Sequence, residues 1–558
     1  MKQTILSILA AAITSIAAAQ VTNEVIPPGW NLSLNKTVAP VTMPAFDKQA
    51  MLNQDAIDDA APSKPYRFAN KFPVDLDLFN AGEWTVLQNG DRIWRLNIKS
   101  PGAHTMNFLM DRYDLPVGGE LFIYNDDHTD KIGPYTYKEN QEDGFLGTWI
   151  VYGDNIWLEY YEPKAVKNQG RISINEVAHG YRGFQRPTQD GAKFLNSSGS
   201  CNVDVNCNPN QSSPNGISWN TVRDNYRNAV GLIIVNGGGS CTGTLINNTN
   251  SDGTPYFLTA DHCLSTPNGT GSGYPSSNWA FGFQWFTNTP DCATFANTVG
   301  PATPVRVLSG ATLRANDDIA DFALFQINQL PPAAWNLYYA GWSRVLSSGN
   351  GQLGMHHPSG DIMKLARNDE AATPISTQFN TNPQTRVWRI SNWEYGVTEP
   401  GSSGSCLLNP SGQIIGVLSG GSAACIGTND NGGFDIYGRF DTSWNSFGAN
   451  TRRLSPWLDP FNSNVTSQNG TFAANLSIAS KESAINIKVF PNPSNGSYTI
   501  NLEETAIYTV YNLSGQVIAQ GVFTGLTNQL DLASVANGVY FLKVTAGTAS
   551  ATAKLVKE

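Results

Sequence analysis

The sequence is poor in charged residues, and its cations are outnumbered by its anions. Only 14% of the 558 residues are charged, with 35 Lys and Arg against 45 Asp and Glu and a formal net charge of −10. About 25% is usual. The shortage of positive charge argues against a nucleic-acid partner, because such binding needs a basic surface. The 41% of hydrophobic residues argues against a disordered chain.

Long hydrophobic runs are also missing, apart from one at the start of the chain. Residues 1–19 read MKQTILSILAAAITSIAAA, a Lys followed by an apolar run that ends in small residues. The run is shorter than the roughly 20 residues that cross a bilayer. We predict a signal peptide that is cleaved after Ala19, a secreted protein and no membrane span.

Cysteine is absent outside one stretch of the chain, which marks a separate domain. An exported chain meets an oxidising compartment, so seven cysteines predict three disulfides and one free thiol. Only one pair is closely spaced, and no second pair or H-x₃-H follows it, so we expect no metal. The seven are Cys201, Cys207, Cys241, Cys263, Cys292, Cys406 and Cys425.

Turn-forming residues indicate an all-β chain of several domains. The 52 Gly and 31 Pro, with few charges, separate short alternating runs such as GGELFIYNDD and SYTINL. We predict a β-rich pro-domain at 20–195, a Cys-bearing domain at 196–462 and a polar linker at 463–482. A small β sandwich follows at 483–558.

One of the six histidines stands where catalysis needs it. In YFLTADHCLS a strand-like run ends just before His262, and the adjacent Cys263 would tie the turn back to the sheet. A general base needs this restraint, although a His beside a Cys is as often structural.

An acid to orient that histidine is found in NDDIADFALFQI. Asp321 directly precedes an apolar strand, where a carboxylate accepts the imidazole Nδ1–H. Asp318 is the rival, and we favour Asp321. Asp317 and Asp318 are expected in a solvated turn.

The segment VTEPGSSGSCLL supplies a nucleophile. Ser403 lies between glycines on a tight turn, and the N–H groups of Gly401 and Ser403 would bind the substrate oxyanion. Gly/Ser turns are common, but His262, Asp321 and Ser403 follow one another in the order of the chymotrypsin arrangement.

These residues resemble those of the lysyl endopeptidases, a secreted bacterial branch of the chymotrypsin-like serine proteases. The resemblance runs from about Gly199 to Pro460 and includes GSCNVDVNC, CTGTLINNT, AGWSR, HHPSGD and YGRFDTSWN. It implies a double β-barrel, with His262 as general base, Asp321 as orienting acid and Ser403 as nucleophile.

The same resemblance implies three disulfides: Cys201 to Cys425, Cys207 to Cys292 and Cys241 to Cys263. The sequence departs from the family at two positions. Cys406 replaces a usual Pro and is expected as a small buried thiol. Ser419 replaces a His that supports the triad, which leaves turnover and pH profile open.

The family resemblance also implies the specificity. A trypsin-type pocket acid would stand at Val397, whereas the lysyl endopeptidases use the position of Asp435 in GGFDIYGRF. We predict cleavage after Lys, with Arg left open. The alternative is that Asp435 is an exposed loop residue. We expect the adjacent His356 and His357 to be structural.

Maturation cannot use the usual ion pair before the nucleophile, because Ser402 stands there. The N-terminal domain is therefore expected to cover the cleft or assist folding. The family pattern places the mature start near Asn196, and we expect self-processing after Lys193.

The C-terminal stretch resembles the type A sorting domain of the type IX secretion system, through VFPNPSNG, YNLSGQVI and ASVANGVYFLKV. An adhesive or carbohydrate-binding sandwich is the alternative. The sequence thus predicts a secreted, monomeric serine endopeptidase that acts on Lys-containing proteins and uses type IX secretion machinery. The competing class is a non-catalytic exported binding protein or adhesin that keeps a protease fold.

Overall fold

The computed structural model describes most of the chain and divides it into two compact units, residues 1–473 and 474–558. The predicted signal peptide (1–19), Lys193 and Asn196 lie outside the described residues. The described chain is mostly β, which confirms the all-β fold class. The described residues are 21–22, 24–32, 34, 37–60, 64–184, 198–210, 213, 216–265, 276–290, 292, 303–379, 382–425, 433–445, 448–473, 487–502, 506–512, 516–546 and 549–558.

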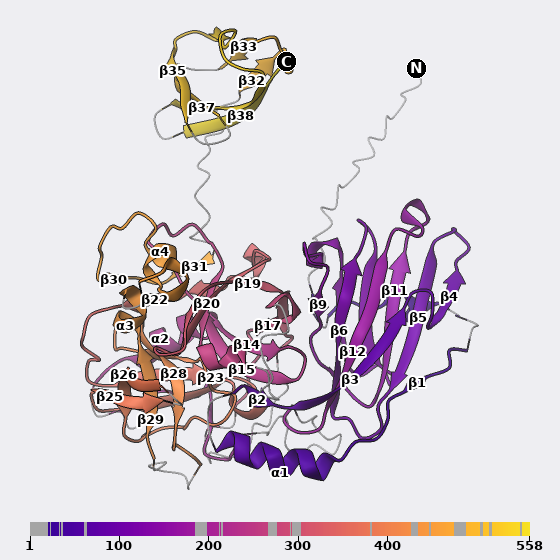
Figure 1. Cartoon of the computed structure of the whole chain (residues 1–558), viewed down its shortest axis with the longest axis vertical. Helices are drawn as coiled ribbons and strands as arrows, with labels where there is room; N and C mark the ends of the chain where they lie inside the picture. Colours follow the sequence, from indigo (N-terminus) through magenta and orange to yellow (C-terminus); the bar gives the residue numbers. More distant parts are fainter. Residues whose placement is uncertain are drawn as a thin grey trace, which may run out of the picture. The chain divides into compact units, whose positions relative to one another are not determined.

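Two facing sheets form an N-terminal sandwich, which we define as residues 41–180 (Figure 1). Its strands alternate apolar and polar side chains, and the apolar ones meet in a buried core. The first sheet contains β1 (Val41–Thr42), β4 (Glu83–Val86), β5 (Arg92–Lys99), β7 (Glu120–Asn125), β8 (Lys131–Tyr135) and β11 (Asn155–Glu162). The second contains β3 (Ala69–Asp77), β6 (Thr105–Asp114), β9 (Leu146–Gly147), β10 (Val151–Tyr152) and β12 (Arg171–Gly180).

Two further sheets form the central part, residues 198–473, one for each expected barrel. Central strands such as β14 and β20 are nearly continuous apolar runs and are buried along almost their whole length. The eight-stranded sheet contains β2 (Tyr66–Arg67), β14 (Val230–Val235), β15 (Gly239–Leu245), β16 (Tyr256–Thr259), β17 (Ala280–Phe283), β18 (Arg306–Ser309), β19 (Ala311–Asp317) and β20 (Phe322–Ile327). The ten-stranded sheet contains β13 (Val203–Asp204), β22 (Gly341–Ser343), β23 (Gln352–His356), β24 (Lys364–Asn368), β25 (Thr373–Phe379), β26 (Asn382–Ile390), β27 (Cys406–Leu408), β28 (Gln413–Gly421), β29 (Asp435–Arg439) and β30 (Ser467–Gln468).

Helices are short and lie between or beside the sheets. The α-helices are α1 (Lys48–Asp59), α2 (Trp219–Tyr226), α3 (Phe440–Asn445) and α4 (Ser455–Leu458). The 3₁₀ helices are η1 (Pro28–Asn31), η2 (Tyr137–Glu139), η3 (Lys164–Val166), η4 (Asp261–Leu264), η5 (Ser276–Asn278), η6 (Ala333–Trp335), η7 (Pro358–Gly360) and η8 (Asn450–Arg452). Within the described residues, no helix has the length and apolar character needed to cross a membrane.

The N-terminal sandwich packs directly on the central part. Trp149 of the sandwich meets Trp285 edge to face, with ring centroids 6.3 Å apart. A side chain at Gly282 on β17 would overlap Trp149, so this glycine permits the close approach. Strand β2, although it lies before the central part in the sequence, pairs with β15 of the central part (Figure 1).

The predicted linker begins too early. Strand β30, inside the predicted 463–482 segment, pairs with β22, and β31 (Thr471–Phe472) pairs with β21 (Tyr338–Tyr339). The ring of Phe472 packs against that of Tyr338 at 5.0 Å. Residues up to 473 therefore belong to the first unit, because their backbone completes sheet edges that sequence periodicity does not reveal.

The second unit is a small β sandwich, as predicted. One sheet contains β32 (Lys488–Phe490), β33 (Ser497–Asn501) and β36 (Thr527–Asp531). The other contains β34 (Ala506–Asn512), β35 (Val517–Phe523), β37 (Gly538–Ala546) and β38 (Ala549–Lys557). Buried side chains such as Tyr498, Val510 and Leu542 form its core.

Candidate active site

His262 lies in the turn that follows β16. The strand ends at Thr259, and η4 carries the histidine, which is buried. The neighbouring Cys263 forms a disulfide with Cys241 on β15. Strand and disulfide together fix the backbone on both sides of the imidazole.

Asp321 holds the histidine through two kinds of hydrogen bond. Its carboxylate accepts the His262 backbone N–H at 3.0 Å and lies 3.0 Å from the ring Nδ1. Asp321 is buried and adopts a left-handed backbone conformation, with φ at 51°, at the turn before β20. An imidazole that donates from Nδ1 carries its lone pair on Nε2 when neutral, the form a general base requires.

The expectation of a solvated turn is wrong for Asp317 and right for Asp318. Asp317 is buried and accepts the N–H groups of Ile319 and Ala320 at 2.9 and 3.1 Å. It also pairs with Arg452, whose Nε lies 2.7 Å away. The side chain of Asp318 is 65% exposed. Arg452 is distant from Asp317 in the sequence, and its ion pair compensates the buried carboxylate. Asp317 therefore stabilises, from a buried position, the turn that carries Asp321.

Ser403 is held beside the histidine turn. Its carbonyl accepts the N–H of Thr242 on β15 at 2.8 Å. The next residue, Gly404, has φ at 84°, and a Cβ there would lie 2.1 Å from the Thr259 Oγ1. Only glycine fits this contact, which brings the nucleophile turn against the end of β16 that leads into His262.

The turn before Ser403 carries the two N–H groups proposed as oxyanion donors. Gly401 has φ at 95°, and its carbonyl accepts the Thr242 hydroxyl at 2.9 Å. Among the described residues, no carbonyl or side chain accepts the N–H of Gly401 or Ser403. This arrangement suits an oxyanion site.

Neutral hydrogen bonds fix the same turn. The Ser402 hydroxyl lies 2.8 Å from His356 Nδ1 and accepts the Glu399 N–H at 3.1 Å. Burial lowers the pKa of His356 to about 3, so the ring is neutral. His357 is also buried, and its Nδ1 lies 3.0 Å from the Asp361 carbonyl. Both histidines therefore have structural contacts, and sequence reasoning missed that one of them supports Ser402.

Asp435 lies buried at the start of β29 and is not an exposed loop residue. Its carboxylate accepts Trp393 Nε1 at 2.7 Å and the Thr398 hydroxyl at 2.5 Å. Burial raises the pKa of Asp435 to about 6, and these hydrogen bonds oppose the rise. Sequence reasoning missed both partners. Thr398 lies in the VTEP block but had no predicted role, and no motif included Trp393.

A cavity of about 80 Å³ connects Asp435 with the nucleophile turn. Its lining from the central part is Thr398, Glu399, Pro400, Gly401, Ser403, Leu418, Gly420, Gly421, Ala423 and Asp435. Val397, where a trypsin-type acid would stand, is buried and apolar. Ser419 is buried on β28 between cavity-lining neighbours.

The three disulfides join the pairs that the family resemblance implies: Cys201–Cys425, Cys207–Cys292 and Cys241–Cys263. Cys406 is the free cysteine and is buried on β27. Burial raises the pKa of its thiol to about 12.

Two family models match the chain, one within each of its two compact units. Residues 195–438 match the family model described as "Lysyl endopeptidase, C-terminal domain". Residues 488–558 match "Secretion system C-terminal sorting domain", which marks the protein as exported. A lysyl endopeptidase of Pseudomonas aeruginosa is 31% identical over 296 residues, which cover 50% of this chain and 57% of that protein. The chain thus spans a little over half of that relative's length.

Two solved structures show a partial likeness at lower sequence identity. The Rv3671c protease of M. tuberculosis in its active form is 18% identical, covers 40% of this chain and 83% of its own, and has a TM-score of 0.26. A Glu endopeptidase in complex with MPD is 18% identical, covers 38% of this chain and 86% of its own, and has a TM-score of 0.23.

Proposed function

We propose that this chain, which carries a lysyl endopeptidase C-terminal domain and a secretion sorting domain, is a secreted serine endopeptidase that cleaves after Lys. One observation carries the proposal. The Asp321 carboxylate binds both the backbone N–H and the ring of His262. Next to this pair, Ser403 lines the same cavity as the buried carboxylate of Asp435.

The reaction follows from these contacts. Ser403 Oγ attacks the substrate carbonyl carbon while His262 Nε2 takes the hydroxyl proton, and Asp321 stabilises the imidazolium. The N–H groups of Gly401 and Ser403 bind the oxyanion. His262 then passes the proton to the leaving amine as the C–N bond breaks. A water that His262 deprotonates hydrolyses the acyl-enzyme and regenerates Ser403. No cofactor takes part in these steps.

Specificity would come from Asp435. A carboxylate at the base of a narrow cavity pairs well with the compact ammonium of Lys, whereas a planar guanidinium needs more room and a second acceptor. The donors Trp393 and Thr398 fix its orientation from one side. We therefore assign the pocket to Lys, with Arg as a weaker substrate.

The remaining parts fit a precursor. We assign residues 1–19 to a signal peptide, 20–195 to a pro-domain and 196–473 to the protease domain, with self-processing after Lys193. Residues 483–558 would direct export by type IX machinery. The mature enzyme is proposed to be a monomer.

The test is a peptide-library digest by the full protein, sequenced at the cut sites, together with organophosphate labelling. We expect cuts after Lys and a covalent adduct on Ser403, and neither with Ser403→Ala. Cuts after Glu or apolar residues would overturn the pocket assignment. A folded protein that neither cuts nor labels would instead be an exported binding protein or adhesin with a protease fold.

A further inference from the structure

Five residues that precede the central part line the candidate cavity, among them Asp58 and Asp59 of α1. Lys64, Pro65 and Tyr66 face it together with Ser403 and Asp435. These three residues begin a segment that continues into β2, the two-residue strand that pairs with the central part. We call residues 64–67 the cleft segment.

The pairing register places the cleft segment along the nucleophile. Tyr66 lies opposite Ser240 on β15, in antiparallel pairing. Two residues beyond Ser240, the Thr242 N–H bonds to the Ser403 carbonyl. Tyr66 is therefore close to the nucleophile turn, and the two residues before it, Pro65 and Lys64, extend into the cavity. Strand addition to an open sheet edge is a common way to bind an extended peptide.

We propose that the backbone of the cleft segment occupies the active site as the backbone of a substrate would, with Lys64 on the acyl side and Pro65 on the leaving-group side of the bond next to Ser403. This inference rests on the proposed function. It places the residues after this bond along the strand edge at Gly239 and Ser240. It also makes the precursor latent by direct blockage of the cleft.

Two features explain why the precursor does not cut this bond. In the proposed binding mode Pro65 would supply the leaving nitrogen, which lies in a ring and has no N–H, and the ring would crowd the position from which His262 delivers a proton. The Lys64 ammonium pairs with Asp58 of α1 at 3.3 Å. The Lys64 ammonium, which Asp435 would otherwise attract, is thus paired with a carboxylate of α1.

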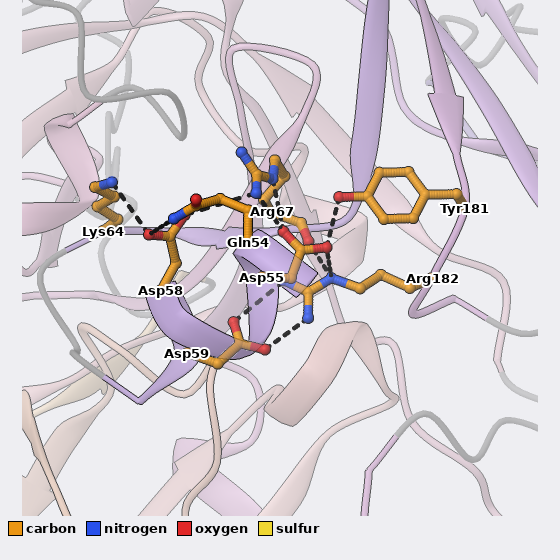
Figure 2. Close-up of polar contacts among 8 residues, drawn as sticks. All are labelled: Gln54, Asp55, Asp58, Asp59, Lys64, Arg67, Tyr181 and Arg182. Carbon is orange, nitrogen blue, oxygen red and sulfur yellow. Dashed lines mark hydrogen bonds and ion pairs between the residues drawn. The ribbon is translucent and has the colours of Figure 1, made fainter. Parts of the chain in front are cut away.

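A buried network of ion pairs and hydrogen bonds holds the cleft segment in place (Figure 2). We call its members, Asp55, Arg67, Tyr181 and Arg182, the clamp. Asp55 of α1 accepts hydrogen bonds from Arg67 Nε and from the Tyr181 hydroxyl, each at 2.7 Å. Arg182 Nε lies 3.0 Å from Asp55 and donates to the Arg67 carbonyl at 2.7 Å.

The clamp joins α1 and the nearby β2 to the two residues that follow β12, and Tyr181 is 126 positions from Asp55. Asp55 is 1% exposed, and the Arg67 side chain is 7% exposed. Breaking one partner of such a buried pair leaves another charge uncompensated, so the clamp opens only with local unfolding. The cleft segment therefore stays bound until the proposed pro-domain, residues 20–195, is removed.

The experiment measures how fast a fluorophosphonate probe labels Ser403 in the uncut full-length chain, which a gel separates from processed protease. We expect the uncut chain to label at least tenfold more slowly than the processed protease. Asp55→Ala should restore fast labelling of the uncut chain. Glu162→Gln, which alters a buried pair with Arg92 inside the sandwich, is the matched control and should not.

Equal labelling of uncut and processed chains would overturn this inference and leave the proposed function intact. The absence of labelling in every form would overturn the proposed function instead.

A second variant does not depend on loosening the fold. With Pro65→Ala we expect a new cut after Lys64, seen as a fragment that begins at residue 65, and no such cut when Ser403→Ala is added. If Pro65→Ala protein cleaves added Lys peptides yet never cuts after Lys64, the cleft segment is not bound as a substrate.

Discussion

The carboxylate of Asp321 holds His262 at two points, its backbone N–H at 3.0 Å and its ring Nδ1 at 3.0 Å. An amide at position 321 would present a donor to Nδ1 and favour the wrong tautomer. We expect Asp321→Asn to lower kcat by roughly 10³ to 10⁴ with little change in KM or in the melting temperature. Steady-state kinetics on a Lys peptide measures this.

Asp318→Asn is the control for that substitution. The Asp318 side chain is 65% exposed and lies three residues before Asp321. Its replacement should leave kcat within twofold. A large loss with Asp318→Asn and none with Asp321→Asn would reverse the assignment of the orienting acid.

The ionisation of Asp435 should be visible in substrate selectivity. Burial raises its pKa to about 6, so in the free enzyme the pocket acid becomes neutral below that pH. The ratio of kcat/KM for a Lys peptide to that for a norleucine peptide should fall about tenfold per pH unit well below 6. Taking a ratio removes ionisations common to both substrates. In Asp435→Asn the ratio should be flat with pH and about 100-fold lower at pH 8.

The charged form of Asp435 should lower the free energy of unfolding. Because the folded pKa lies above that of an exposed Asp, folding favours the neutral form. The resulting stabilisation is complete below about pH 4 and is lost as the pH rises through about 6. In the inactive Ser403→Ala background, Asp435→Asn should therefore melt at a higher temperature than Asp435 at pH 8, with the difference vanishing near pH 4. A difference independent of pH would contradict the buried-charge explanation.

A buried cation within the ten-stranded sheet should matter more for stability than any exposed pair. Lys364 is 3% exposed and lies 2.6 Å from Asp204 and 3.6 Å from Asp361. Lys364→Ala leaves both carboxylates buried without their cation, and we expect a loss of about 3–5 kcal/mol in urea unfolding of the Ser403→Ala protein. Asp224→Ala breaks an exposed pair with Arg227 and should cost less than about 1 kcal/mol.

Sequence alone located the residues whose signal is local. His262 follows a strand-like run, and Ser403 lies in a glycine-rich turn, so each could be found from its neighbours. The burial of Asp317 could not, because its partner Arg452 is 135 residues away. The cleft segment was missed for a similar reason. Its strand has two residues, too few for periodicity, and its pairing partner β15 begins at Gly239.

The thiol of the free cysteine should not react with alkylating reagents in the folded protein. Cys406 is buried on β27, and burial raises the pKa of its thiol to about 12, so the reactive thiolate is scarce at pH 8. We expect iodoacetamide to add no group to the native chain and one group per chain after unfolding without reductant, counted by intact mass. Cys406→Ala should remove that single addition and leave kcat unchanged. Fast native alkylation that abolishes activity would instead show that the β27 thiol is reachable from the cleft, which its burial forbids.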